Sequence, residues 1–376
     1  MSVLQVEPYV IDDTSQILSP GLVVFADIVE QNIDGMIRIA GSAARLRPHC
    51  KTHKMLDVTR LQVARGITKH KCATIAEAEM LAEAGVEDVF LAYNPVGPHV
   101  ERCVKFAQKC SHVQFCVTAD HEKPLRELSA ACVKGNVEIG VVLDVDTGYH
   151  RTGIPMNTDA AVSLYGQIVD LPGVFADGLH VYDGQNHQTD LGERKAAVDA
   201  VFAEACEFAD RLDACGYPVP RLVVGGTGSF PVFAEYDDPR IELSPGTTVF
   251  HDTGYGESFP DLDFQPASVL ITRVVSRCHD DRMTLDVGNK SVASDPPFGT
   301  RLYFPDLPDA ETIVHNEEHL VLLTDKATQY EPGDVLLAIP RHTCPTSALH
   351  KSAYVVRGGR VVDEWLVTAR DRKITI

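Results

Sequence analysis

The sequence predicts an α/β fold followed by a second, mostly antiparallel β domain. From about Phe25 to about Phe250, short apolar runs alternate with longer amphipathic segments, and strands that alternate with helices pair in parallel. After about Leu262, strand-like runs follow one another, separated by Pro, Gly and Asp. Eight strand-helix units fit the first part, and periodicity alone does not choose between a barrel and a doubly wound sheet.

Each predicted element rests on its own pattern. The first-part strands are apolar runs at Gly21–Phe25, Asp88–Tyr93, Val137–Asp144 and Arg221–Val224. Helices are predicted at Ile75–Ala84 and Lys195–Ala205, where strong helix formers carry apolar residues three and four positions apart. The tail strands are Val269–Val275, Met283–Val287, Leu320–Leu323, Asp334–Ile339 and Ala353–Val356.

Composition excludes several classes of partner. A chain of 376 residues suggests two domains, and its formal charge of -19 argues against nucleic acid and anionic membrane surfaces, which require a basic face. No apolar run approaches the ~20 residues of a membrane span, and the amino terminus lacks a leader pattern, so we expect a cytoplasmic protein. The ten cysteines are scattered, without a Cys-x-x-Cys pair, and most are expected to be reduced core residues.

The segment Arg47–Lys54 is the most informative one for chemistry. It holds two lysines, two histidines and an arginine without a carboxylate among them. A lysine that is desolvated beside other cationic groups has a lowered pKa, which leaves more free amine to attack a carbonyl and form a Schiff base. A basic surface patch is the alternative interpretation.

The segment Leu222–Phe230 is an apolar strand that runs into glycines and hydroxyls. Glycines let the backbone approach an anion, and consecutive amides with the Thr and Ser hydroxyls can hold a phosphate. The segment lacks the Lys-Ser/Thr of a nucleotide P-loop and the spacing of a dinucleotide fingerprint. It therefore indicates a phosphate site for another cofactor, with Ser244–Thr248 as its second side, although a plain turn is also consistent with it.

Two further segments follow apolar strands. In Leu143–Gly153, Arg151 can donate to a phenolate or carboxylate oxygen, with the aspartates orienting it; a loop with an ordinary ion pair is the alternative. In Pro340–Thr346, His342 and Cys344 stand two positions apart, and on an extended chain they point the same way and can bind one metal ion. Substrate and water would complete such a shell.

Together these segments resemble the pyridoxal-phosphate enzymes built like alanine racemase, in the branch of D-threonine aldolase and eukaryotic-type D-serine dehydratase. The resemblance covers nearly the whole chain and implies an eight-stranded (β/α)8 barrel of the TIM type over residues 16–262, a β domain over 263–376 with 1–15, and a homodimer. It implies that Lys51 carries the cofactor and that Arg151 contacts its phenolic oxygen. The remaining cofactor-binding residues implied are Tyr182, Gly226, Thr227, Gly228 and Ser229.

The same resemblance implies a metal at His342 and Cys344 and chemistry on a small β-hydroxy D-amino acid. The metal binds the β-hydroxyl while the cofactor withdraws electrons from the α-carbon. Loss of the hydroxyl proton then gives retro-aldol cleavage to glycine and an aldehyde. Loss of the α-proton with departure of hydroxide gives dehydration, which turns D-serine into pyruvate and ammonia.

The residues divide between these reactions. His187 follows Tyr182 in a pattern similar to that of the aldolase and would be the base for the β-hydroxyl, although it stands one residue nearer the tyrosine than expected. Cys344 is the dehydratase-like ligand, and its thiolate favours zinc over manganese or magnesium. We favour the aldolase, with the dehydratase as the alternative. An amino-acid racemase or a non-catalytic cofactor carrier is a further alternative, and neither would need the metal.

Overall fold

The computed structural model describes residues 4–376, and the chain divides into two compact units. One unit comprises residues 36–51, 59–246 and 371–376, and the other comprises residues up to 35, 52–58 and 247–370. We call them the barrel unit and the β unit. Helix α1 (Ala26–Ala40) and helix α2 (Leu56–Val63) each have residues in both.

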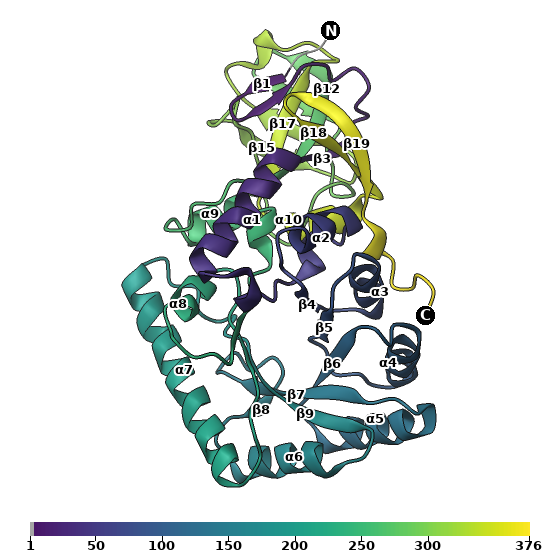
Figure 1. The fold of residues 1–376 in the computed structure, drawn as a ribbon. Helices are drawn as coiled ribbons and strands as arrows, with labels where there is room; N and C mark the ends of the chain where they lie inside the picture. The colour runs from purple at the N-terminus through teal and green to yellow at the C-terminus, as the bar shows by residue number, and fades with distance from the viewer. Residues whose placement is uncertain (1–3) are drawn as a thin grey trace. The chain divides into compact units, whose positions relative to one another are not determined.

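The barrel unit contains a parallel sheet whose strands alternate with helices along the chain (Figure 1). The sheet order is β11-β10-β9-β7-β6-β5-β4, with the short β8 beside β7. Its strands are β4 (Lys69–Cys72), β5 (Asp88–Leu91), β6 (Gln114–Ala119), β7 (Ile139–Asp146), β8 (Ile154–Pro155), β9 (Val174–Val181), β10 (Leu222–Val224) and β11 (Ile241–Leu243). Its other helices are α3 (Ile75–Glu83), α4 (Pro98–Lys109), α5 (Glu122–Gly135), α6 (Asp159–Asp170), α7 (Leu191–Ala214) and α8 (Phe230–Ala234).

An extended segment, residues 46–49, closes this sheet into a ring. Leu46 forms a parallel bridge with Leu243 of β11, and His49 forms one with Lys71 of β4. The Arg47 amide donates to the Leu243 carbonyl at 2.8 Å, and the Lys71 amide donates to the Pro48 carbonyl at 2.9 Å. The predicted eight-membered parallel barrel is confirmed, with this segment as its first member.

The interior of the ring is layered because side chains two apart on a strand face the same side. An apolar layer of Phe90, Cys116, Val142 and Val223 is fully buried. On the side of the amino ends lie charged residues such as Asp88, two positions before Phe90 on β5. On the side of the carboxyl ends lie polar residues such as Asp144, two positions after Val142 on β7. We call the polar residues at the carboxyl end the polar floor of the barrel.

The β unit is built on a second, largely antiparallel sheet with the order β15-β16-β13-β12-β3-β18-β19; β17 pairs with β12 and β14. Its strands are β1 (Leu4–Val6), β2 (Tyr9–Ile11), β3 (Gly21–Phe25), β12 (Ser268–His279), β13 (Arg282–Leu285), β14 (Leu302–Tyr303), β15 (Glu311–His315), β16 (Leu320–Leu323), β17 (Val335–Pro340), β18 (Ser352–Arg357) and β19 (Arg360–Leu366). Its helices include α9 (Thr253–Ser258) and α10 (Thr343–Leu349). The predicted antiparallel character is confirmed, with β3 and β18 as a parallel exception.

One predicted strand forms as expected but belongs to a different sheet from the one predicted. Gly21–Phe25 was expected among the alternating units of the first part, but it lies between β12 and β18 in the β unit. All five of its residues are buried, so its sequence fits an interior strand of either sheet equally well. The expected domain bounds themselves remain a prediction.

Two compositional expectations concern the described residues as a whole. All ten cysteines are free thiols, six of them buried. Within residues 4–376, no helix is long and apolar enough to cross a membrane.

Candidate active site

Lys51 stands at the carboxyl end of the barrel. It lies in the 3-10 turn Cys50–Thr52, which directly follows the segment that closes the ring. Its side chain is exposed, and its backbone amide donates to His49 Nδ1 at 3.2 Å. The catalytic ends of barrel enzymes are the carboxyl ends of the strands, so the fold presents this amine at the expected face.

The basic segment is not one cationic cluster, which corrects the sequence interpretation. Arg47 is fully buried and paired, with Nη2 2.7 Å from Asp88 Oδ2 and Nε 2.5 Å from Glu242 Oε2. His53, in the β unit, is buried, and desolvation lowers its pKa to about 3. The carboxylates that neutralise Arg47 come from β5 and β11, which are distant in sequence. Local sequence therefore gave no sign of them.

The crowded lysine is Lys71, which the sequence interpretation did not consider. It lies on β4, only 3% exposed, with Nζ 3.4 Å from His180 Nε2. His180 Nδ1 in turn lies 2.7 Å from Asp144 Oδ1. Burial lowers the pKa of Lys71 to about 7, and the charges of Lys51 and Arg151 act in the same direction. The one feature of the sequence that could have pointed to Lys71 is the position of this lysine within a buried strand.

A bulge in β9 aims His180 at this floor. The register of β9 against β7 shifts between Val141 and Leu143, which leaves an extra residue near Gly178. Gly178 has φ +104°, and a Cβ there would stand 2.1 Å from the Arg221 carbonyl oxygen. Asp177, before the bulge, contacts Arg221, while His180, after it, contacts Lys71. Both face the interior although they are three positions apart, because the bulge shifts the alternation by one residue.

Arg151 lies against aromatic rings rather than against the aspartates. Its guanidinium carbon is 4.8 Å from the centroid of the Tyr182 ring and 5.1 Å from that of Tyr149. We expected the aspartates to orient Arg151, but both bind other partners. Asp144 binds His180, and Asp146 accepts hydrogen bonds from the backbone amides of Gly148 and His150. A small pocket is lined by Asp144, Arg151 and Tyr182, among others. The structure thus brings together Arg151, Tyr182 and Lys71, whose Nζ lies 5.5 Å from the Tyr182 centroid.

The glycine-rich turn follows β10 directly. Gly225 has φ +75°, and a Cβ on Gly226 would stand 3.2 Å from the Tyr182 ring, so the turn lies flush against that ring. Thr227 and Ser229 are buried. The Ser229 hydroxyl donates to Asp183 at 2.7 Å and accepts from the Gly226 amide at 3.1 Å. Its oxygen therefore organises the turn, and Gly228 lies within the same turn.

His187 lies on the exposed loop between β9 and α7. Its backbone amide donates to the Gln185 carbonyl at 3.0 Å. The Gln185 side chain donates to the Thr147 carbonyl at 2.6 Å, and the Thr147 hydroxyl donates to the Tyr182 carbonyl at 2.8 Å. The loop that carries His187 is thus tied to the loop after β7, at the same end of the barrel as Tyr182.

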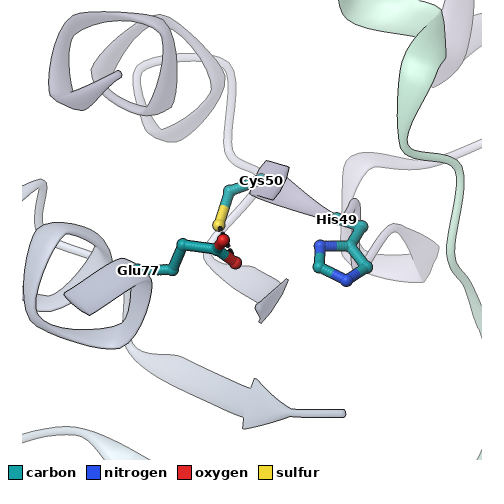
Figure 2. A group of neighbouring side chains, drawn as sticks. All are labelled: His49, Cys50 and Glu77. Carbon is teal, nitrogen blue, oxygen red and sulfur yellow. Dashed lines mark hydrogen bonds between the residues drawn. The ribbon is translucent and has the colours of Figure 1, made fainter. Parts of the chain in front are cut away.

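A further group of potential ligands consists of His49 and Cys50, which directly precede Lys51 in the chain, and Glu77 (Figure 2). Ligand atoms of His49, Cys50 and Glu77 are within 4.8 Å of one another. Cys50 and Glu77 point toward each other, with Sγ 3.6 Å from Oε2. The same carboxylate oxygen accepts from the Ala73 amide at 2.6 Å. These bonds fasten the turn that carries Lys51 to the start of α3.

The predicted metal ligands lie in the β unit. His342 is the N-cap of α10 and Cys344 is in its first turn, so the expected extended chain is wrong from Thr343 on. Asp252 accepts from the Thr343 amide at 2.9 Å and fixes the start of this helix. Burial by itself lowers the pKa of His342, but hydrogen bonds and charges from Cys344 and Asp295 raise it to about 9. The two predicted ligands are therefore neighbours despite the helical turn.

Groups that sequence reasoning missed surround this pair. Asp295 Oδ2 lies 2.5 Å from His342 Nδ1, which leaves Nε2 as the nitrogen for a metal. Thr52 Oγ1 lies 3.2 Å and Thr247 Oγ1 3.7 Å from Cys344 Sγ. None of these three residues is near its partner in sequence, so no local pattern could have pointed to them.

The fold and these side chains define a class: a barrel protein whose lysine, cations and glycine-rich turn suit a phosphorylated carbonyl cofactor. The chain belongs to the family described as alanine racemase, N-terminal domain, which matches residues 26–253. A second family model, putative serine dehydratase domain, matches residues 267–356.

Known relatives match nearly the whole chain. D-threonine aldolase of an Arthrobacter species is 32% identical over 96% of this chain and 94% of its own length. 3-Hydroxy-D-aspartate aldolase of Paracoccus denitrificans is 31% identical over 96% of this chain and 94% of its own. The crystal structure of D-threonine aldolase from Filomicrobium marinum is similar with a TM-score of 0.86 at 28% identity, covering 94% of this chain and 95% of that one.

Proposed function

We propose that this protein is a lyase, dependent on pyridoxal phosphate and a divalent metal, that cleaves small β-hydroxy D-amino acids to glycine and an aldehyde. One observation carries the proposal: Lys71, Arg151 and Tyr182 gather with the glycine-rich turn at the end of a barrel whose first member leads into Lys51. Full-length similarity to proteins named D-threonine aldolase and 3-hydroxy-D-aspartate aldolase supports it.

The residues of the barrel unit fit pyridoxal phosphate. Gly226 lacks the Cβ that would meet the Tyr182 ring, and this leaves a cradle beside the buried hydroxyl of Thr227. Lys51 would hold the carbonyl carbon, Arg151 the phenolic oxygen, and the backbone of Gly226–Ser229 the phosphate. When bound, pyridoxal phosphate supplies an electron sink for the α-carbon.

The residues of the β unit fit a divalent metal. A histidine whose second nitrogen binds a carboxylate is the usual arrangement of a metal ligand, and His342 with Asp295 has it. The hydroxyls of Thr52 and Thr247 lie within hydrogen-bond distance of Cys344 Sγ and hold the sulfur in place beside His342. A thiolate and an imidazole suit zinc better than manganese or magnesium. When bound, the metal supplies a Lewis acid for the β-hydroxyl.

We assign a separate role to each of the chain's own residues at this site. Arg151 would orient the bound group, and Tyr182 would pack beside it. His187 would accept the proton of the β-hydroxyl as the bond between the α- and β-carbons breaks. The apolar layer of Phe90 and its neighbours closes the barrel below the floor and keeps bulk water from reaching it through the barrel.

A dehydratase is the second candidate, and Cys344 is the observation that favours it, together with the family model named putative serine dehydratase domain. In that reaction a base removes the α-proton and the metal assists departure of hydroxide. A homodimer and a cytoplasmic location complete the proposal as predictions, and nucleic acid and membranes are not expected as partners.

Product analysis tests the proposal. Purified protein with pyridoxal phosphate is incubated with D-threonine or D-serine, with and without a chelator, and products are identified by mass spectrometry. Glycine from D-threonine that disappears with the chelator is expected. Pyruvate from D-serine instead would support the dehydratase, and no product from either substrate would favour a racemase or a cofactor carrier.

A further inference from the structure

We propose that Lys71 is a second catalytic amine of this site, which exchanges protons with the α-carbon of the bound amino acid, and that Asp144 and His180 position it. This inference rests on the proposed function.

Lys71 is on β4, the strand that pairs with the closing segment, and its amide donates to Pro48 at 2.9 Å. Lys51 follows that segment by two residues. Among the charges that act on the Lys71 amine, that of Lys51 has the largest effect. Lys71 therefore flanks the position where Lys51 would hold the cofactor, and the α-carbon of a bound amino acid joins at that same position.

Asp144 accepts the Nδ1 proton of His180, which leaves Nε2 as an acceptor for one N–H of Lys71 at 3.4 Å. Burial lowers the pKa of His180, so the ring stays neutral and keeps this tautomer. Asp144 itself stays charged: burial raises its pKa, but His180 and Thr152 outweigh burial and lower it. A reactive group bonded to a base that a third group orients is the arrangement found in activated nucleophiles and proton carriers.

Charged and polar groups around Lys71 come from several elements. They are Arg47 and Lys51 near the closing segment, Asp144 and Arg151 from β7 and its loop, and His180, Tyr182 and Asp183 from β9 and its loop. The charges of Lys51 and Arg151, and that of Arg47 although it is paired with Asp88 and Glu242, oppose the ammonium form of this buried amine, and Asp144 favours it. The amine is therefore able to both lose and gain a proton near neutral pH.

The reaction requires such a group. When the bond between the α- and β-carbons breaks, the β-oxygen becomes a carbonyl and its proton goes to a base, proposed as His187. The electron pair stays with the α-carbon, which must gain a proton to become glycine. The Lys71 ammonium would supply it and recover a proton from solvent, so protons balance without any oxidant. Dehydration would use the neutral amine in the opposite sense, to remove the α-proton.

Hydrogen exchange in glycine tests this role. Wild-type protein with pyridoxal phosphate in D2O should exchange one α-hydrogen of glycine, followed by proton NMR. Lys71→Met should slow this exchange by roughly 10²–10⁴-fold while the absorbance of the bound cofactor stays. In Lys71→Arg the exchange should be equally slow, because a guanidinium keeps the charge but does not release its proton. Lys105→Met, which changes an exposed lysine on α4, is the control and should exchange normally.

A second measurement is independent of turnover. With ¹³Cε-labelled lysine, the signal that disappears in Lys71→Met identifies Lys71, and in protein without cofactor it should titrate near pH 7. A midpoint near that of an ordinary lysine would overturn the inference, as would wild-type exchange in either Lys71 variant. Wild-type protein without cofactor absorbance or exchange would instead contradict the proposed function, and the inference with it.

Discussion

The sulfur of Cys344 has two threonine hydroxyls against it, at 3.2 Å from Thr52 and 3.7 Å from Thr247. Either atom of each pair can be the donor, so the hydroxyls can donate to a thiolate or accept from a thiol. A metal selects the first arrangement. Cys344 therefore has two hydroxyl contacts at its sulfur and lies beside a histidine whose orientation Asp295 fixes.

Cys344→Ala should lower metal content and activity together. Only His342 would remain of the two predicted ligands, and loss of one ligand weakens binding severely. Elemental analysis after dialysis, with activity on the same sample, measures both. Cys215→Ala, which removes an exposed thiol elsewhere, is the control. Full metal content and activity in Cys344→Ala would leave Cys344 as an ordinary thiol.

Lys51→Ala should abolish the absorbance of the bound cofactor, because the predicted covalent link is lost. The measurement is the visible spectrum after removal of free pyridoxal phosphate. Lys134→Ala, on the exposed side of α5, should keep the spectrum. A Lys51→Ala protein as yellow as the wild type would remove Lys51 from its role.

At the scale of elements, regular periodicity was sufficient for most strands and helices but not for the barrel's first member. Residues 46–49 include Pro48, which lacks an amide proton, and two polar residues. Their sequence is typical of a basic loop, although they form parallel bridges with β11 on one side and with β4 on the other. The bulge at Gly178 could not be predicted from the sequence either, because a single inserted residue leaves the apolar pattern of β9 intact while it turns His180 inward.

The residues of the candidate site also form two groups: those that a local sequence pattern identifies, and those that only the fold brings together. Lys51, Arg151, Tyr182 and the glycine-rich turn stand in recognisable local patterns, so the sequence suffices to nominate them. Lys71 and Asp295 act through partners more than forty positions away, and only the fold brings these together.

Gly178→Ala should destabilise the barrel more than an ordinary glycine substitution. A positive φ alone costs an alanine about 1–3 kcal/mol, and the added Cβ would also meet the Arg221 carbonyl oxygen at 2.1 Å. Gly216→Ala is the matched control, with φ +81° and no atom within 4 Å of the added Cβ. Urea unfolding of both variants isolates the effect of the close approach. Equal losses of stability would show that the bulge can relax.

At the scale of the whole barrel unit, a charged layer ties five members of the ring together. Arg47 binds Asp88 and Glu242, Lys69 binds Glu242 at 2.8 Å, and Arg221 binds Asp88 at 2.9 Å and Asp177 at 3.1 Å. Such pairs are weak evidence for net stability, since their desolvation offsets the attraction, but removing one partner leaves a buried charge.

Glu242 should make stability depend on acid. Burial raises its pKa, but Arg47 and Lys69 lower it to about 2, below its ordinary value of 4.5. Its contribution is therefore present above pH ~4.5 and is lost as the pH falls toward ~2. At ~1.4 kcal/mol per pH unit it amounts to about 3 kcal/mol. Urea unfolding between pH 7 and pH 3 should show a shallower loss of stability in Glu242→Gln than in the wild type. Glu204→Gln, exposed on α7, is the control, and equal slopes in all three proteins would contradict the assignment.

The cations at the barrel mouth lie in a molecule with a formal charge of -19. An anion such as pyridoxal phosphate is therefore repelled at long range and attracted only within the last few ångströms. Dissolved salt screens the distant repulsion first, because the screening length is about 30 Å at 0.01 M but about 8 Å at 0.15 M. Uptake of the cofactor should consequently become faster as ionic strength rises toward physiological values, the reverse of ordinary electrostatic steering. In a dilute buffer the negative exterior should therefore slow uptake of the cofactor, and at physiological ionic strength this effect should be largely lost.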